Sequence, residues 1–292
     1  MKLSTSLNVY SDAYCSYEEM LLRASKCGFT CFDFNPGGRV FYNSENWREN
    51  TRRIKEYADS LGVAFTQSHV YCFNYPAPAD ADFHIRKTIE AASIAGVPWA
   101  VMHPFFTGKE DRMEVLEENI RIFEPYIEYA KSLNVGIAIE NMYKRIYWFG
   151  ETVTWTGERK ERETFTRSDD LICLVDALNA KYGNVGVCWD TGHAHLSMDS
   201  QYEDIVKLGS RLKVLHIADN AGQADEHLPS FYGYVNWKEI MRALDAIDYQ
   251  GTFNFEVHNF TRGLPDELKD DAVRLLYKIG EYVVHMNRDD SK

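Results

Sequence analysis

Short apolar runs alternate with amphipathic segments along this chain of 292 residues. A strand that is buried on both faces reads as a nearly continuous apolar run, whereas an amphipathic helix repeats its apolar residues every three or four positions. The sequence predicts strands at residues 3–9, 30–34, 63–68, 99–102, 135–139, 184–189, 212–215 and 251–255. It predicts helices at residues 16–27, 47–61, 80–95, 112–133, 169–181, 201–208, 236–247 and 265–285. Strict alternation of this kind implies right-handed crossovers and a parallel sheet.

Eight strand–helix units in one chain of this length favour a closed barrel. A (β/α)8 TIM barrel typically needs about 250 residues plus insertions. The rival architecture, an open doubly wound sheet, normally carries a glycine-rich phosphate-binding turn after its first strand. The corresponding turn at residues 8–12 reads NVYSD and contains no glycine. We therefore predict an α/β protein in which residues 1–292 form a single (β/α)8 TIM barrel domain.

Two features interrupt the regular pattern. Pro125 lies inside the predicted helix at 112–133, where a missing N–H and a ring clash predict a kink or a break. Residues 141–167 form one long excursion after the fifth strand, rich in charged and aromatic side chains. In a barrel this excursion is expected on the catalytic face, where loops after strands carry specificity. Trp148, within it, is a candidate substrate contact.

Four of the predicted strands run directly into a residue that can bind a metal: Glu140, Asp190, His216 and Glu256. A carboxylate or imidazole that closes a buried strand is costly unless something pairs with it. In a parallel barrel all strand ends converge on one rim, where active sites lie. Three carboxylates and one imidazole suit Mn²⁺ or Zn²⁺, with Mg²⁺ and Co²⁺ as further options. The sequence therefore predicts one divalent metal ion held by these four side chains.

Further polar residues are expected on the same rim. His69 and His103 follow the third and fourth strands, and His193 lies three residues after Asp190. Asp225 and His227 lie in the loop after the strand that ends at His216. Any one of them could be an ordinary packing or hydrogen-bonding residue. Together they are candidates for orienting substrate oxygens or for holding further metals.

The charge and composition of the chain exclude some partners. The formal net charge is -12, which argues against binding to a phosphate backbone, because that affinity rests on clustered lysine and arginine. No apolar stretch approaches the ~20 residues of a membrane span, and the N-terminus lacks the apolar region of a signal peptide. The six cysteines show no paired CxxC spacing, which is typical of reduced thiols in the cytosol. We expect a cytoplasmic protein without membrane or nucleic-acid partners.

Several short motifs carry a resemblance to a known family. They are Ile139-Glu140-Asn141, Trp189-Asp190-Thr191-Gly192-His193, Leu215-His216-Ile217-Ala218-Asp219-Asn220, Asp225-Glu226-His227-Leu228-Pro229 and Phe255-Glu256. With these motifs the chain resembles the xylose isomerase-like barrel superfamily over nearly its whole length. That superfamily groups sugar isomerases and epimerases, inosose isomerases and dehydratases, and endonuclease IV.

The ketose epimerase branch of the superfamily implies roles for individual residues. One metal is bound there by two glutamates, an aspartate and a histidine, which match Glu140, Glu256, Asp190 and His216. The two glutamates also act as the acid–base pair, and the histidine that matches His193 holds substrate oxygens. The resemblance thus implies a metal-dependent sugar or polyol isomerase or epimerase that works through an enediolate. Relatives often form homo-oligomers.

Two other branches of the superfamily remain as alternatives. The epimerases place an arginine in the loop after the seventh strand, whereas residues 220–224 read NAGQA. The pair Asp225 and His227 looks more like the inositol-catabolism and general sugar-phosphate isomerase members. An inosose-type dehydratase is one alternative. Endonuclease IV binds three zinc ions with nine residues, and all nine types have a match here. The acidity of the chain and the segments after Glu140 and His227 count against such a zinc phosphodiesterase.

Overall fold

The computed structural model describes residues 1–10, 15–35, 44–72, 79–149, 158–162, 164–198 and 200–287. Its main sheet consists of parallel strands in the order β10-β1-β2-β3-β4-β5-β8-β9. These strands are β1 (Leu3–Ser6), β2 (Cys31–Phe34), β3 (Ala64–His69), β4 (Trp99–Met102), β5 (Gly136–Glu140), β8 (Val185–Asp190), β9 (Leu212–His216) and β10 (Phe253–Phe255). The helices that follow them are α1 (Tyr17–Lys26), α3 (Trp47–Ser60), α4 (Ala81–Ile94), α5 (Arg112–Ser132), α6 (Ser168–Asn179), α7 (Thr191–His195), α8 (Tyr202–Leu208), α9 (Trp237–Ala246) and α10 (Asp266–His285).

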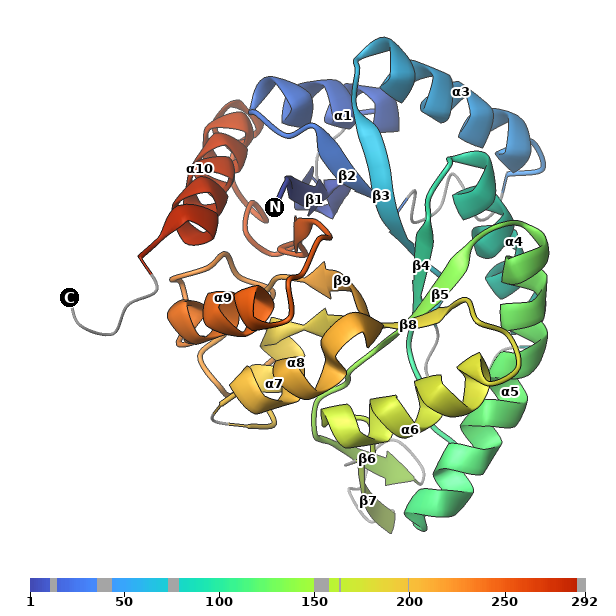
Figure 1. Ribbon diagram of the computed structural model, residues 1–292. Helices are drawn as coiled ribbons and strands as arrows, with labels where there is room; N and C mark the ends of the chain where they lie inside the picture. Colours follow the sequence, from blue (N-terminus) through green and yellow to red (C-terminus); the bar gives the residue numbers. More distant parts are fainter. Residues whose placement is uncertain are drawn as a thin grey trace.

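The two end strands of this sheet, β9 and β10, meet and nearly close a barrel. A parallel bridge joins Ile217 to Phe255. In this bridge the Ile217 N–H donates to the Asn254 carbonyl at 2.8 Å, and the Glu256 N–H donates to the Ile217 carbonyl at 3.0 Å. Figure 1 shows the strands in the middle of the molecule, with the helices arranged around them. The predicted (β/α)8 TIM barrel is thus confirmed.

Alternating side chains separate two apolar layers. One face of each strand packs against the helices; Phe32, Trp189 and Phe255 are fully buried there. The other face points into the barrel, where a small cluster of Val101, Ala138, Cys188 and Val214 fills the interior, with Trp99 packed against it. The alternation explains why the strands read as continuous apolar runs. Within the described residues, no helix combines the length and apolar composition needed to cross a bilayer.

The first strand is shorter than predicted. It ends at Ser6 and is followed by a short 3-10 helix, η1 (Leu7–Tyr10), instead of extending to residue 9. The Asn8 N–H donates to the Ser6 hydroxyl oxygen at 3.1 Å, a local bond that competes with strand pairing. Leu7 and Val9 are buried although they lie outside the strand, so the apolar pattern alone does not mark where the strand ends.

Helix α5 is not broken at Pro125. It runs without interruption from Arg112 to Ser132, so the prediction of a break was wrong. Proline removes the hydrogen bond to the carbonyl of Arg121, one turn earlier. Both residues are exposed, so water can satisfy that carbonyl.

The predicted excursion at 141–167 contains an unexpected hairpin. Strands β6 (Arg145–Phe149) and β7 (Glu158–Arg162) pair antiparallel in a separate sheet, near α6 in Figure 1. The excursion leaves the barrel directly after Glu140, the last residue of β5. It therefore begins at the rim where the other strand ends meet.

Candidate metal centre

Four side chains from four strand ends converge at the rim of the barrel. Glu140, Asp190 and His216 are the last residues of β5, β8 and β9, and Glu256 follows β10. In the sheet register Asp190 is the direct neighbour of His216. One possible ligand atom from each of the four lies within 4.8 Å of the others. We call these residues the central group; it is the set that the sequence pattern predicts as metal ligands.

The central group concentrates negative charge in a buried place. Nδ1 of His216 lies 2.8 Å from Oε1 of Glu140 and 3.3 Å from Oε2 of Glu256. Oδ1 of Asp190 accepts the backbone N–H of His193 at 2.7 Å, while its Oδ2 is buried without a hydrogen-bond partner among the described residues. A buried carboxylate oxygen that lacks a donor carries a large desolvation cost. A divalent cation would offset that cost, so the donor set fits one.

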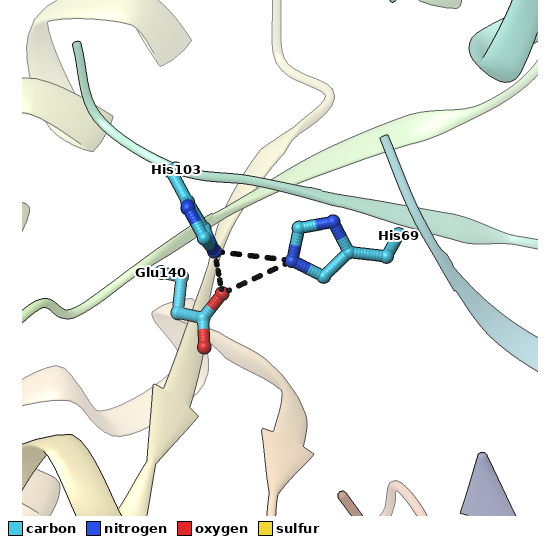
Figure 2. A group of neighbouring side chains, drawn as sticks. All are labelled: His69, His103 and Glu140. Carbon is cyan, nitrogen blue, oxygen red and sulfur yellow. Dashed lines mark hydrogen bonds and ion pairs between the residues drawn. The ribbon is translucent and has the colours of Figure 1, made fainter. Parts of the chain in front are cut away.

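A second group, His69, His103 and Glu140, shares one glutamate with the first. Figure 2 shows the two imidazoles and the carboxylate facing one another. The two Nε2 atoms are 3.1 Å apart, and Oε2 of Glu140 lies 3.0 Å from Nε2 of His103 and 3.5 Å from Nε2 of His69. Metal–ligand bonds of about 2.1 Å in a tetrahedral zinc site give ligand separations of about 3.4 Å. The distances between these three atoms are therefore close to those between ligand atoms on one metal ion.

A third group, His193, Asp225 and His227, lies on another side of the central group. Oδ2 of Asp225 is 3.3 Å from Nε2 of His193 and 3.1 Å from Nε2 of His227. Nδ1 of His193 is 3.6 Å from Oε1 of Glu140, and Nδ1 of His227 is 3.7 Å from Oε2 of Glu256. The structure thus brings all nine predicted rim residues into one continuous cluster.

Three of the histidines share one hydrogen-bonding pattern. Nδ1 of His69, His193 and His227 lies 2.7, 2.9 and 3.0 Å from the backbone carbonyls of Val70, Asn141 and Glu256. A carbonyl only accepts, so each Nδ1 carries a proton. Each Nε2 then faces a carboxylate oxygen, an arrangement that requires either a second proton or a cation between them. Metal-binding histidines commonly hold their other nitrogen in this way.

Without a metal, protons take the place of the cation on these histidines. Burial lowers the pKa of His69 and His193, but the hydrogen bond of His69 to Glu140 and the charge of Asp190 next to His193 raise both pKa values to about 10. Burial also lowers the pKa of His227, and its hydrogen bond to Asp225 raises that pKa to about 9. For Asp190 burial is the largest effect and raises the pKa to about 6. A cation that binds here must compete with protons.

Metal affinity should therefore increase with pH. Burial lowers the pKa of His216, but the carboxylates of Glu256 and Glu140 raise it well above 6.5 and so favour the protonated imidazole in the metal-free protein. A ligating imidazole must lose that proton. We expect the affinity for Mn²⁺, measured by titration calorimetry, to rise about tenfold per pH unit from about pH 6 to about pH 8 for each proton displaced. An affinity that stays constant over this range would contradict proton displacement.

Two residues without a predicted role hold the ligands in place. Asn141 accepts the backbone N–H of Asp190 at 2.6 Å and donates to the Asp190 carbonyl at 2.9 Å. Asp219, fully buried, accepts the N–H of Phe231, the N–H of Val235 and the indole N–H of Trp237, which fixes the loop that carries Asp225 and His227. Both residues stand in the motifs quoted above, but neither ends a strand, so the strand-end pattern did not single them out.

Two non-glycine residues in this loop, His227 and Phe231, have a positive φ. His227 has a φ of 49°, in the left-handed region that non-glycine residues rarely adopt. Leu228, the next residue, exchanges backbone hydrogen bonds with Asp219 at 2.8 and 3.0 Å. Non-glycine residues in such conformations persist where the surroundings over-determine them, often at functional sites.

The candidate aromatic contact from the excursion remains untested. Trp148 lies in β6, and its side chain lies outside the described part of the structure. Tyr143 from the same excursion does contact the cluster, with its ring 5.0 Å from the ring of His193. On the opposite side His258 lies 3.9 Å from His227, ring centre to ring centre. Tyr143 and His258 are thus further residues at the edge of the site.

A family model and several known protein sequences match this chain. A family model described as xylose isomerase-like TIM barrel matches residues 21–279. The uncharacterised protein y4fM of Sinorhizobium fredii is 28% identical over 181 residues, which make up 59% of this chain and 51% of that protein. A probable endonuclease 4 of Mycoplasmopsis pulmonis is 23% identical over 168 residues, 54% of each protein. The matches thus span about half the length of these curated relatives.

Solved structures resemble the whole barrel. A D-tagatose 3-epimerase-like protein has a TM-score of 0.70 at 21% sequence identity, with 97% of this chain and 98% of that chain covered. The IOLI protein with a bound zinc atom has a TM-score of 0.73 at 16% identity, with 97% and 98% covered. At these identities the likeness shows a common fold.

Proposed function

The chain belongs to the xylose isomerase-like TIM barrel family, and on that premise we propose that it is a divalent-metal-dependent isomerase or epimerase of a sugar or polyol. The observation that carries this proposal is the central group, in which two glutamates, an aspartate and a histidine face one point at the barrel rim. The D-tagatose 3-epimerase-like structure and the zinc-bound IOLI structure support a small-molecule sugar chemistry and a divalent ion.

We assign the metal to Glu140, Asp190, His216 and Glu256, with Mn²⁺ or Zn²⁺ as the ions best suited to this mixture of oxygen and nitrogen donors. When bound, the ion would polarise the carbonyl and hydroxyl oxygens of the substrate and stabilise the negative charge that develops there. A proton on the carbon next to a carbonyl is weakly acidic, so both this stabilisation and a positioned base are needed.

The two glutamates differ in how freely they can exchange a proton. Oxygens of Glu140 lie 2.8 to 3.6 Å from nitrogens of His216, His103, His69 and His193, and its side chain is 1% exposed. Burial raises the pKa of Glu140, but His216 and His103 lower it well below its usual range. The side chain of Glu256 is 12% exposed and contacts only His216 and His227 among the described histidines. Glu256 is therefore the better placed of the two to take the substrate proton first.

The fate of that proton sets the reaction. Delivery of a second proton by Glu140 to the opposite face of the same carbon gives epimerisation; Glu140 would take that proton from protonated His69, whose Nε2 lies 3.5 Å from its Oε2. Return of the first proton by Glu256 to the neighbouring carbon gives aldose–ketose isomerisation. A positioned acid–base group contributes roughly 10² to 10⁴ in rate. His69, His103, His193, Asp225 and His227 would orient substrate oxygens or hold further ions.

A second candidate, zinc-dependent phosphodiester hydrolysis, is favoured by one observation. The nine rim residues form three groups, two of which share Glu140, and each group has the spacing of a metal site. Several ions together suit phosphodiester cleavage. One of the curated relatives is a probable endonuclease 4. The net charge of -12 opposes the approach of a polyanion. We therefore rank this function below isomerisation. A dehydratase, which begins with the same proton abstraction and then expels water, stands between them.

Proton exchange with solvent separates these functions directly. The metal-loaded protein, incubated in D₂O with a ketose such as D-tagatose, should exchange one carbon-bound hydrogen for deuterium, because an enediolate takes its proton back from a group in contact with solvent. Proton NMR detects the lost signal, and a panel of ketoses and inososes identifies the substrate.

The same panel contains the contrary outcomes. A dehydratase would release water and yield an unsaturated product, visible as a mass 18 Da lower. A nuclease would cut DNA that contains an abasic site and would leave every sugar unlabelled. Cleavage of DNA without any exchange on the panel would overturn the proposed function.

A further inference from the structure

A buried carboxylate that the strand-end pattern does not include lies beneath the central group. Asp33 is in β2, between Ser6 of β1 and Gln67 of β3 in the sheet register, and is 1% exposed. Its Oδ2 accepts the Gln67 side-chain N–H at 3.3 Å. Its Oδ1 has no hydrogen-bond partner among the described residues. A carboxylate buried in this way needs a reason, because its burial is costly.

The imidazole of His216 lies between this carboxylate and the central group. Its Nδ1 faces the glutamates, 2.8 Å from Oε1 of Glu140. Its Nε2 has no hydrogen-bond partner within the described part of the chain, and Oδ2 of Asp33 lies 3.8 Å from it. The two nitrogens therefore point to different acidic partners, one at the candidate metal site and one inside the barrel.

Metal binding would decide which of the two nitrogens carries the proton. A neutral imidazole that ligates through Nδ1 holds its proton on Nε2. An N–H buried in the barrel interior needs an acceptor, and a carboxylate behind a ligating histidine is a common solution. The thiol of Cys188 also lies near His216, but sulfur is a weak acceptor. The Asp33 carboxylate is the stronger acceptor on that side.

Gln67 links this carboxylate to the strand that carries the histidine. Its side-chain nitrogen lies 3.3 Å from Oδ2 of Asp33 and 3.4 Å from the carbonyl of Leu215, the residue before His216. Gln67 is fully buried. The carboxylate is therefore held at a fixed distance from the backbone of β9, as a residue that orients a ligand must be.

We propose that Asp33 is a positioning residue for the metal centre: its carboxylate, 3.8 Å from Nε2 of His216, favours the proton on that nitrogen and thereby keeps Nδ1 free for the divalent ion. This inference rests on the metal site of the proposed function. The strand-end pattern did not reveal Asp33 because it lies within the run Cys31-Phe32-Asp33-Phe34 instead of closing it.

The test is a titration of the metal-free full chain with Mn²⁺ by calorimetry. We expect Asp33→Leu, which removes the acceptor, to weaken binding about 100-fold, and Asp33→Asn, which keeps a weaker acceptor, about tenfold, within the usual effect of such partners. Melting temperatures of the metal-free variants show how far each change affects the fold itself. A merely structural aspartate would lower the melting temperature without weakening Mn²⁺ binding by the folded protein.

Asp204 offers a matched control. It is 1% exposed in helix α8, and its Oδ1 accepts both the backbone N–H and the hydroxyl of Ser168. Asp204→Asn should lower the melting temperature but leave Mn²⁺ affinity within about twofold, because its partners lie outside the nine rim residues. In zinc-loaded wild type, nitrogen NMR of the histidines should place the His216 proton on Nε2.

The possible outcomes separate the two proposals. Wild-type affinity in both Asp33 variants would overturn this inference and leave the proposed function standing. Weakened binding in Cys188→Ser together with normal binding in Asp33→Leu would assign the role to Cys188 instead. A wild-type chain that binds neither Mn²⁺ nor Zn²⁺ would overturn both proposals.

Discussion

Replacement of Glu256 by glutamine should abolish turnover while the fold survives. Glutamine keeps the shape of the side chain but cannot accept a proton from carbon. We expect kcat to fall by about 10³-fold or more, near the upper part of the range for a positioned acid–base group. The fold should tolerate the change because the hydrogen bond of His227 uses the backbone carbonyl of Glu256, which the substitution leaves in place.

Four measurements on this variant separate loss of the base from loss of the metal. Turnover and deuterium exchange report the chemistry, circular dichroism reports the fold, and elemental analysis reports bound metal. Glu226→Gln is the matched control. Glu226 lies in the same rim loop, where its Oε2 accepts the Ala221 N–H at 2.7 Å, but it belongs to none of the three ligand groups. It should keep turnover within about twofold. Near-normal turnover of metal-loaded Glu256→Gln would disprove the two-glutamate mechanism.

The equivalent change at Glu140 should have a broader effect. Glu140 belongs to both the central group and the group with His69 and His103, so the amide would leave several protonated imidazoles without their anionic partner. A buried ion pair that loses one partner is strongly destabilised. We expect Glu140→Gln to lose metal and thermal stability as well as turnover, in contrast to Glu256→Gln.

The fold and the four ligands of the central group could be predicted because both follow from one regularity. β5 and β8 have no charged residue before their last position, and β9 has only Lys213, so Glu140, Asp190 and His216 stand out at the ends of their strands. Parallel strands then place those ends on one rim. The distances among these side chains depend on the directions in which the side chains point. The repeat of apolar residues along the sequence does not give those directions.

The residues that escaped prediction act through their surroundings. Asn141 holds Asp190 through backbone atoms, and Asp219 organises a loop through three donors that lie 12 to 18 residues further along the chain. Asp33 sits inside an apolar run, where a single polar residue looks like an exception to the pattern. Each becomes interpretable only when its hydrogen-bond partners are known. The same holds for the shortened first strand, where the Asn8 N–H donates to the Ser6 hydroxyl just after the strand ends.

The charge balance of the site connects its ligands to stability. Glu140, Asp190 and Glu256 converge in the barrel interior, and the cation that the site fits would neutralise part of their charge. In its absence, protons on His69, His193 and His227 do so, because their pKa values are raised to about 10, 10 and 9. The stabilities of metal-loaded and metal-free protein should therefore differ most in the pH range where those histidines lose their protons.

Removal of the metal should abolish turnover and make stability depend on pH. The raised pKa values of the three histidines stabilise the metal-free fold fully below about pH 6.5, their unfolded value, and that stabilisation is lost as the pH rises through 9 to 10. The melting temperature of the chelated protein should thus fall as the pH rises from about 7 to about 9.5. Metal at 100 times its dissociation constant adds about 2.7 kcal/mol of stability. Differential scanning calorimetry with and without EDTA measures both effects.

Stoichiometry completes this experiment. We expect one tightly held metal per chain by elemental analysis, bound by the central group, and restoration of turnover when one equivalent of Mn²⁺ or Zn²⁺ is returned. The two outer groups then act on the substrate through protonated or hydrogen-bonded histidines. Three metals per chain would mean that the His69 and His193 groups are also ligand sets, because each has the spacing of one. Chelation that leaves turnover unchanged would exclude the metal-dependent reaction, since the two glutamates alone provide no cation to stabilise the developing negative charge.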